Sequence, residues 1–379
     1  MAPLVMDSKG ALYGTTKKGG DAFGDGTVFQ LTPPVPPAST WTHKVIHTFT
    51  LGGDGFTPVA GLAINTSGAL FGTTSGGGKF NAGTVFKLKP PVPPATTWTE
   101  KILYSFGAFS GDLSGPSAGV VFDSKGHLYG TASGGSEPNI SGGVFKLKPP
   151  VPPATEWTEK VLYSFKGPPD GTVPTAPVVL DSTGALFGTT SMGGHIGGSC
   201  SSIGGCGTAF KLTPPVPPAT NWTETVLHRF KGFPNDGALP AAGLTFGSDG
   251  ALFGTTVNGG AGNIGTAFML TPSALTETVI HNFLQGGGHN DGGVVLAGLV
   301  LGSDGALYGT NSEGGPPPAH GVAFRLTQAG GETVLHGFAS TTTDGGNPAA
   351  AMIFNSNGAL FGTTTVGGAS NCGTVFKLH

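Results

Sequence analysis

GALYGTT, residues 10–16, is the stretch of sequence that decides the fold, because the chain contains seven copies of it. The segment returns as GALFGTT from residues 68, 184, 250 and 358, as GHLYGTA from 126 and as GALYGTN from 305, at spacings of 58, 58, 58, 66, 55 and 53 residues. A period of this length is typical of repeat architectures. The 379 residues are therefore expected to form seven like units rather than two or three unrelated domains.

Three further elements accompany each copy. AGLTF (242–246) stands before one copy, GTVFKL (83–88) follows another, and WTEKILYSF (98–106) represents a third element that occurs six times. Each element is short, rich in β-branched and aromatic residues and bounded by Gly, Pro, Asp or Ser, which predicts a strand. Four antiparallel strands in a repeat of about 55 residues predict an all-β, seven-bladed β-propeller. We expect the AGL strand innermost, GALYGTT second, GTVFKL third and WTEK outermost.

The last repeat is incomplete. The chain starts at an innermost strand (2–7) and ends at a third strand (373–379), so the last blade lacks its outer strand unless another segment completes it. We expect one domain, 1–379, and favour a fragment without its closing strand over a three-stranded blade. An open edge of this kind also offers self-association. The approximate blades are 1–50, 51–107, 108–166, 167–231, 232–284, 285–339 and 340–379.

Composition excludes several classes of protein. The chain has 69 Gly and 31 Pro, yet 37% of its residues are hydrophobic, 25 are Phe and only 10% are charged, which argues against disorder. A net charge of −3 without a basic stripe argues against nucleic-acid binding. No apolar run approaches the length of a membrane span. No cofactor is expected.

A proline-rich segment, KLKPPVPPATTW (87–98), looks like a ligand for an aromatic groove. Related copies begin at 31, 147 and 212, each between a third and an outer strand, so we interpret the segment as a stiff connector at the rim. A tryptophan follows every copy, and exposed tryptophans stack on sugars, whereas packing on the neighbouring prolines is the alternative. These rim tryptophans are Trp41, Trp98, Trp157 and Trp222.

The repeat resembles a known family. The composite DGxxPxAGLxFDSxGALYGTTxxGGxxxxGTVFKLT, followed by TETVLHxF, is similar to the Gloeo-Verruco (GloVer) repeat. The residues that carry the resemblance are 236–240, 242–244, 250–256, 259–260 and 265–271. The resemblance covers essentially the whole chain. It implies an exported or cell-surface bacterial protein and no established enzymatic activity.

Two of the three cysteines lie in the longest loop. Cys200 and Cys206 flank SSIGG, and a disulfide between them is expected in an oxidising compartment. A metal site that includes His195 is the weaker alternative, and no metal is expected. Cys372 occupies the repeat position of Cys206, and we expect it to be a buried or half-buried free thiol.

The candidate ligand-binding residues lie in loops. Five aspartates precede an innermost strand and are expected on one face with the Gly-Gly loops, where they could bind cations or a polar ligand; the alternative is that each caps its own turn. His195, His289 and His320 break the repeat on the same face. The five aspartates are Asp54, Asp170, Asp236, Asp291 and Asp344.

Four histidines share one position of the outer strand with two tyrosines, which favours a packing role over ligation. They are His47, His228, His281 and His336, with Tyr104 and Tyr163 in the other two copies. We therefore expect a repeat scaffold that binds an unknown glycan, peptide or protein through its loop face. The alternatives are a polysaccharide hydrolase or lyase and an assembly module that pairs through its open edge.

Overall fold

The computed structural model describes residues 2–137, 140–286, 289–317 and 320–379, apart from the side chains of 285, 286, 289 and 290. The chain forms two compact units, Met1–Ser164 and Phe165–His379. Their boundary falls at the end of the third sheet. The prediction of one domain and its blade limits stays a prediction.

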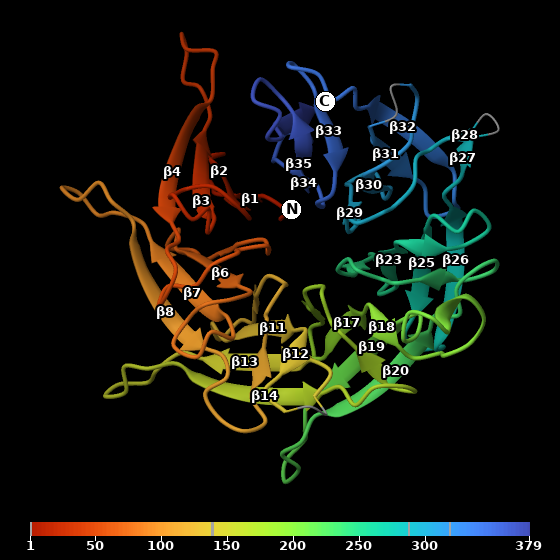
Figure 1. The fold of residues 1–379 in the computed structure, drawn as a ribbon, viewed down its shortest axis with the longest axis horizontal. Coiled ribbons are helices and arrows are strands. Elements are labelled where there is room, and N and C mark those ends of the chain that lie inside the picture. Colours follow the sequence, from red (N-terminus) through yellow and green to blue (C-terminus); the bar gives the residue numbers. More distant parts are fainter. Residues whose placement is uncertain (1, 138–139, 287–288, 318–319) are drawn as a thin grey trace. The chain divides into compact units, whose positions relative to one another are not determined.

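The first unit contains three four-stranded antiparallel sheets (Figure 1), each built by one repeat in chain order. The order confirms the predicted sequence of strands within a blade. The strands are β1 (Val5–Met6), β2 (Leu12–Thr16), β3 (Thr27–Thr32) and β4 (Thr42–Thr48); β5 (Ala63–Ile64), β6 (Leu70–Thr74), β7 (Thr84–Lys89) and β8 (Thr99–Ser105); and β10 (Val121–Phe122), β11 (Leu128–Ala132), β13 (Gly143–Lys148) and β14 (Thr158–Ser164).

The described residues of the second unit form four four-stranded sheets. Its first three repeat the same order, with β16 (Val179–Leu180), β17 (Leu186–Thr190), β19 (Thr208–Thr213) and β20 (Thr223–Arg229); β22 (Thr245–Phe246), β23 (Leu252–Thr256), β25 (Thr266–Thr271) and β26 (Thr276–Asn282); and β29 (Val300–Leu301), β30 (Leu307–Asn311), β31 (Val322–Leu326) and β32 (Glu332–Gly337).

The last sheet differs from the others. It contains β34 (Ile353–Phe354), β35 (Leu360–Gly367) and β36 (Val375–Leu378), and β33 (Gly345–Pro348) pairs with the far half of β35. Among the described residues of the second unit, no strand pairs with the free edge of β36. Seven antiparallel sheets of this repeating order confirm the all-β fold class of a seven-bladed β-propeller.

Phenylalanine rings pack the sheets of each unit against one another. Phe49, which follows β4, meets Phe86 on β7 with ring centroids 5.1 Å apart and an edge-to-face geometry. Phe230 and Phe268 repeat this contact at 5.0 Å in the second unit. All four rings are fully buried. Such pairs add about 0.5–1.5 kcal/mol beyond the burial of their area.

The glycine of each GALYG segment makes room for one of these rings. Gly72 on β6 pairs with Phe86 on β7. A Cβ on Gly72 would lie 2.6 Å from the ring of Phe86, closer than real Cβ contacts allow. The small residue in the second strand and the large residue in the third therefore act as one packing unit.

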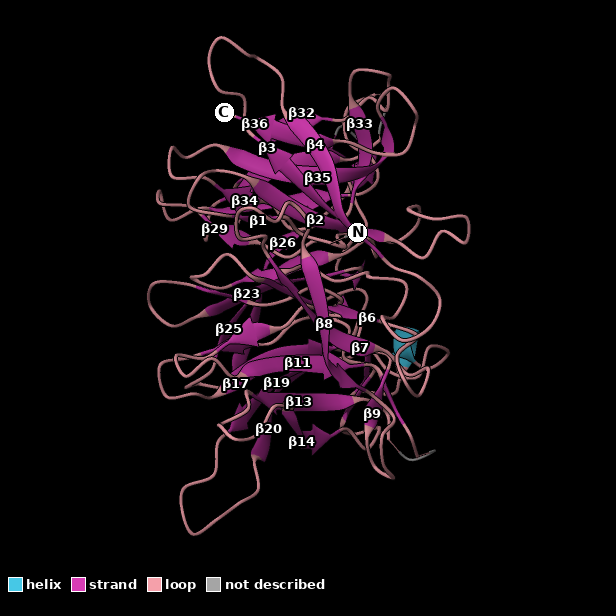
Figure 2. Cartoon of the chain, turned by 90° about the vertical axis from the view of Figure 1, so that its left-hand side faces the viewer, coloured by secondary structure: helices cyan, strands magenta, loops and turns pink. Residues whose placement is uncertain are grey.

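Short ladders join the aspartate loop of a repeat to the loop after its second strand. They pair β9 (Leu113–Ser114) with β12 (Gly134–Gly135), β15 (Gly171–Thr172) with β18 (Met192–Gly193), and β21 (Gly237–Ala238) with β24 (Asn258–Gly259). A further ladder pairs β27 (Gln285–Gly286) with β28 (His289–Asn290), which both precede Asp291. Figure 2 shows that strands and loops dominate, with one 3-10 turn, η1 (Gly198–Cys200). No helix among the described residues is long and apolar enough to cross a membrane.

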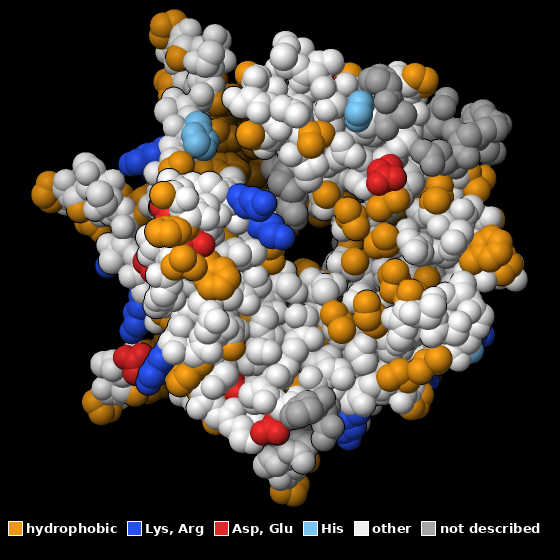
Figure 3. All heavy atoms as spheres, viewed as in Figure 1, with side chains coloured by type: hydrophobic (Ala, Val, Ile, Leu, Met, Phe, Trp, Pro, Cys, Tyr) orange, Lys and Arg blue, Asp and Glu red, His pale blue; other side chains and the backbone are white. Residues whose placement is uncertain are grey.

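The proline connectors project from the sheets. The β3–β4, β7–β8 and β13–β14 connections of the first unit, and β19–β20 of the second, extend as long loops in Figure 1. Their tips carry hydrophobic side chains (Figure 3), and the valines there are 64–78% exposed. These exposed valines are Val35, Val92, Val151 and Val216.

Candidate functional site

A pocket of about 510 Å³ lies between the second and third sheets of the first unit. Its walls come from the ends of β5, β6 and β7 on one side and from β10 and the start of β14 on the other. We call it the aromatic pocket. The residues that line it are Ile64, Asn65, Thr66, Phe71, Lys87, Phe122, Asp123, Ser124, Gly126, Pro149 and Trp157.

Three aromatic rings form one wall of the aromatic pocket. Phe71 is the buried member, because it sits in the second strand of its sheet with only 2% of its surface exposed. The half-buried ring of Trp157 lies edge-on to Phe71 at 6.5 Å between centroids, and Phe122 does so at 5.0 Å. Trp157 is the last residue of the proline connector between β13 and β14, so this connector of the third sheet places the ring against Phe71 of the second sheet. Packing, rather than contact with solvent alone, holds the tryptophan in place.

Polar groups stand beside this wall. The Nζ atom of Lys87 lies 5.3 Å from the centre of the Phe71 ring, within reach of a cation–π contact. Asn65 uses its Oδ1 to accept the backbone N–H groups of Ser67 and Ala69 at 3.1 and 2.9 Å. The Nδ2 of Asn65 makes no hydrogen bond to any described residue, which leaves a donor for a ligand.

Asp123 is held in its charged form. Burial alone would raise the pKa of this carboxyl, but hydrogen bonds from the ring and backbone of His127 and the backbone of Lys125 lower it below its ordinary value. The ring Nδ1 of His127 lies 2.6 Å from Asp123 Oδ2, and the hydroxyl of Tyr129 donates to the same oxygen at 3.1 Å. Asp123 is therefore a fixed, charged acceptor at the edge of the aromatic pocket.

The junction between the first and second sheets is built differently. Trp98 lies edge-on to Tyr13 there, at 5.9 Å. Gln30 donates to the Tyr13 hydroxyl at 3.0 Å, and that hydroxyl donates to Asp7 at 3.0 Å. Burial, followed by the charge of Asp7, raises the pKa of Tyr13 to about 12. The polar groups of this junction are thus satisfied by one another.

An equivalent junction between two sheets of the second unit repeats some contacts of the aromatic pocket. Lys211 lies over the Phe187 ring at 5.4 Å, and Phe187 meets Phe246 at 5.6 Å, as Lys87, Phe71 and Phe122 do. Leu275, which is 55% exposed, occupies the position of Trp157 in this repeat. The counterpart therefore differs from the aromatic pocket in Leu275 for Trp157, and also in Gly247 for Asp123 and Asp181 for Asn65.

The five predicted aspartates lie in turns, where each carboxylate accepts a backbone N–H. This is the arrangement that the alternative sequence interpretation described, while ligand binding by these residues stays a prediction. The donors are Thr50 to Asp54, Lys166 to Asp170, Lys231 to Asp236, Leu284 to Asp291 and Ala339 to Asp344.

Among the described residues, neither His195 nor His320 belongs to a cluster of potential ligand groups. His195 is exposed in the long loop, and His320 is half-buried in a bridge with Gly314. The side chain of His289 lies outside the described residues. Their role in binding stays a prediction.

Buried glutamates were missed by the sequence reasoning. The second residue of β8, β14 and β26 is a glutamate that faces the aspartate of the preceding repeat, so the repeated Thr-Glu pair was the available signal. Burial, followed by the charge of Asp54, raises the pKa of Glu100 to about 8. Burial and Asp112 do the same for Glu159.

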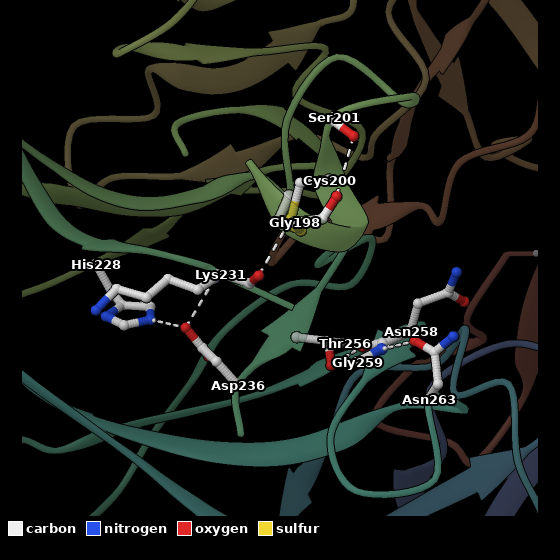
Figure 4. Close-up of a disulfide and its surroundings, with 11 residues drawn as sticks. Gly198, Cys200, Ser201, His228, Lys231, Asp236, Thr256, Asn258, Gly259 and Asn263 are labelled. Atoms are coloured by element: carbon white, nitrogen blue, oxygen red, sulfur yellow. Dashed lines mark hydrogen bonds and ion pairs between the residues drawn. A yellow bond between two sulfur atoms is a disulfide. The ribbon is translucent and has the colours of Figure 1, made fainter. Parts of the chain in front are cut away.

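The cysteines divide as follows. Cys200 and Cys206 are joined by a disulfide, with Cα atoms 5.1 Å apart and both side chains fully buried (Figure 4). Cys372 is exposed, so its predicted burial is wrong. The loop after β20 covers Cys206, where a Cβ on Gly232 would lie 2.9 Å from its sulfur. Among the described residues the last sheet has no outer strand beside β36, so no loop follows it to cover Cys372.

Solved structures share the fold at low sequence identity. A candidate 6-phosphogluconolactonase from Bacteroides uniformis is 15% identical, with a TM-score of 0.58 over 97% of this chain and 91% of that one. PorZ, a surface component of the type-IX secretion system of Porphyromonas gingivalis, is 15% identical with a TM-score of 0.53 over 98% of this chain. The chain spans only 46% of PorZ.

A third structure is the extracellular domain of a candidate one-component system from B. thetaiotaomicron. It is 9% identical, with a TM-score of 0.54 over 98% of this chain and 37% of that one. None of the curated proteins matches the sequence. The sequence model of the Gloeobacter/Verrucomicrobia repeat matches residues 1–245, 92–296 and 196–379, which together span the chain.

Proposed function

The chain belongs to the Gloeobacter/Verrucomicrobia repeat family, and from that premise we propose that it is an exported binding scaffold whose aromatic pocket takes a glycan. The observation that carries this proposal is the wall of Trp157, Phe71 and Phe122 beside Lys87 and Asp123. Binding pockets are commonly apolar clefts with a few fixed polar groups that orient the ligand.

The chemistry of the wall suits a sugar ring. The apolar C–H face of a pyranose stacks on an amphipathic indole, which is rigid and loses little entropy on binding. Lys87 and the Nδ2 of Asn65 offer donors to hydroxyl oxygens. The two oxygens of Asp123 already accept four hydrogen bonds, so this carboxylate contributes a fixed negative charge at the edge of the pocket.

Two further observations fit a protein of the cell surface. Two proteins of similar fold are described as a bacterial surface component and an extracellular domain. The disulfide between Cys200 and Cys206 fits an oxidising compartment. We therefore place the proposed glycan outside the cell.

Affinity electrophoresis tests the proposal. The chain is run through gels that contain glucans, mannan, chitin oligosaccharides or polygalacturonate, together with W157L, which copies Leu275, and W98L as the matched control. Trp98 also packs on a neighbouring ring but lies outside the aromatic pocket. Retardation that W157L loses and W98L keeps supports the proposal; retardation by no polysaccharide contradicts it. Release of reducing ends in the same gels would instead support the enzyme alternative.

A further inference from the structure

Three clusters of His, Asp and Glu lie where neighbouring sheets meet. In each, the His comes from a fourth strand, the Asp from the loop that follows it, and the Glu from the fourth strand of the next sheet. One ligand atom from each residue lies within 4.8 Å of the others. The clusters are His47–Asp54–Glu100, His228–Asp236–Glu277 and His281–Asp291–Glu332.

The first cluster has the spacing of metal ligands. His47 Nε2 lies 3.5 Å from Glu100 Oε1 and 3.8 Å from Asp54 Oδ2. Zinc bonds of about 2.0–2.2 Å place tetrahedral ligand atoms roughly 3.3–3.6 Å apart. Neither His47 Nε2 nor Glu100 Oε1 has a hydrogen-bond partner among the described residues, although both atoms are buried.

The second cluster carries more deeply buried carboxylates. The side chain of Glu277 is only 9% exposed, and its Oε1 has no partner in the described part of the chain. The same holds for Asp236 Oδ1, in a side chain that is 10% exposed. His228 Nε2 forms a hydrogen bond of 2.9 Å with Asp236 Oδ2 and lies 4.0 Å from Glu277 Oε2, so a metal ion at this site replaces the proton between His228 and Asp236. Buried oxygens without a donor are costly, and a cation would satisfy them.

The imidazole rings of both clusters are held in place by packing. His47 lies edge-on to Phe49 at 4.7 Å, and His228 lies edge-on to Phe230 at 4.8 Å. Because both phenylalanines are fully buried, the rings cannot turn away from the carboxylates without disturbing the core. Fixed orientation of an imidazole is typical of metal ligands.

The third cluster differs in its histidine. His281 Nε2 lies 3.1 Å from Asp291 Oδ2, and Nδ1 lies 3.2 Å from the carbonyl oxygen of Gly330. Two acceptors require two N–H donors, so this ring is an imidazolium, which has no lone pair for a metal. The third cluster is therefore an ion pair and not a metal site.

We propose that the clusters of His47 and His228 each bind one zinc ion through the imidazole nitrogen and two carboxylates. A set of one nitrogen and two oxygens suits zinc, and three protein ligands leave a fourth position for water or an external ligand. This inference departs from the sequence expectation of no metal and does not depend on the glycan proposal. Each ion would join two neighbouring sheets of its unit.

One repeat shows which side chain can replace the histidine of these clusters. Tyr104 occupies the histidine position in the second sheet and donates to Asp112 at 2.8 Å. H47Y and H228Y should therefore keep the packing and the hydrogen bond to Asp while removing the nitrogen ligand. H281Y is the matched control, because it makes the same change in the third cluster.

Equilibrium dialysis of the full chain against ZnCl2, followed by zinc quantification, tests the proposal. Cys372 is a free, exposed cysteine. Because thiolates are zinc ligands, the parent and every variant carry Cys372→Ser. We expect saturable binding of two ions per chain, one in H47Y or H228Y, none in the double variant and two in H281Y. The metal-free thermal midpoints should match that of the parent, which excludes loss by unfolding.

Three outcomes would contradict the proposal. If the parent shows no saturable zinc binding, neither cluster is a zinc site. If H47Y and H228Y each still bind two zinc ions per chain, the zinc binds elsewhere on the surface. A loss caused by H281Y would contradict the separation of the third cluster from the other two.

Discussion

Tyr104 donates a hydrogen bond of 2.8 Å to Asp112, a carboxylate that is 0% exposed. Y104F should therefore lower the free energy of unfolding by about 1–3 kcal/mol, because a buried acceptor loses a donor. Urea unfolding measures the loss. Y308F is the control: Tyr308 donates to Asp304 at 3.0 Å, but that carboxylate is 40% exposed, and water replaces the donor. Equal effects of the two variants would contradict this account.

Glu159 gives the fold a specific dependence on pH. Burial, followed by the charge of Asp112, raises the pKa of Glu159 from 4.5 to about 8. The folded state therefore holds this proton more tightly than the unfolded state. The resulting contribution to stability is complete below about pH 4.5 and is lost progressively as the pH rises to about 8.

E159Q isolates this effect, since Gln keeps the neutral shape and does not titrate. Thermal midpoints measured from pH 5 to pH 9 should fall more steeply in the parent than in E159Q. Parallel curves would show that Glu159 is already ionised at low pH in the folded protein.

The sequence predicted much of the fold and little of the candidate site, for a physical reason. The glycine and phenylalanine that pack together, such as Gly72 and Phe86, lie in one repeat and recur in every copy. The aromatic pocket joins Phe71 of one repeat to Trp157 of the next connector, and Glu100 faces the aspartate of the preceding repeat. Contacts between repeats depend on how sheets pack, which periodicity alone does not specify.

The hydrogen bonds within turns were easier to predict from the sequence, because donor and acceptor lie only a few residues apart. The Asp-Gly loops were predicted either to bind a ligand or to cap their own turns, and the hydrogen bond from Thr50 to Asp54 is of the second kind. The prediction that Cys372 is buried was wrong for the opposite reason. Burial at this position requires a loop from outside the segment, and the place of Cys372 in the repeat does not show whether that loop is present.

Gly72 should be intolerant of a methyl group. A Cβ there would lie 2.6 Å from the Phe86 ring, so G72A must displace a ring that is 0% exposed. We expect a loss of about 1–3 kcal/mol in urea unfolding, as overpacked cores show. G53A is the control, because a Cβ on Gly53 would have nothing within 4 Å. If G72A is as stable as G53A, the proposed packing unit is wrong.

A second pocket should be obtainable by three substitutions. The second unit already has Phe187, Lys211 and Phe246 in the arrangement of the aromatic pocket, with Leu275, Gly247 and Asp181 in place of Trp157, Asp123 and Asn65. The triple variant L275W, G247D and D181N should raise the number of glycan sites per chain from one to two, measured by calorimetric titration. A stoichiometry that stays at one would contradict the assignment of these residues to the glycan site.

The proposal that the aromatic pocket binds a glycan is tested most directly by isothermal titration calorimetry. The parent chain, W157L and W98L are titrated with the oligosaccharide of the polysaccharide that retards the parent most strongly. The account predicts one site per chain, at least a tenfold weaker affinity in W157L and an unchanged affinity in W98L. Equal affinities for the parent and W157L would contradict it.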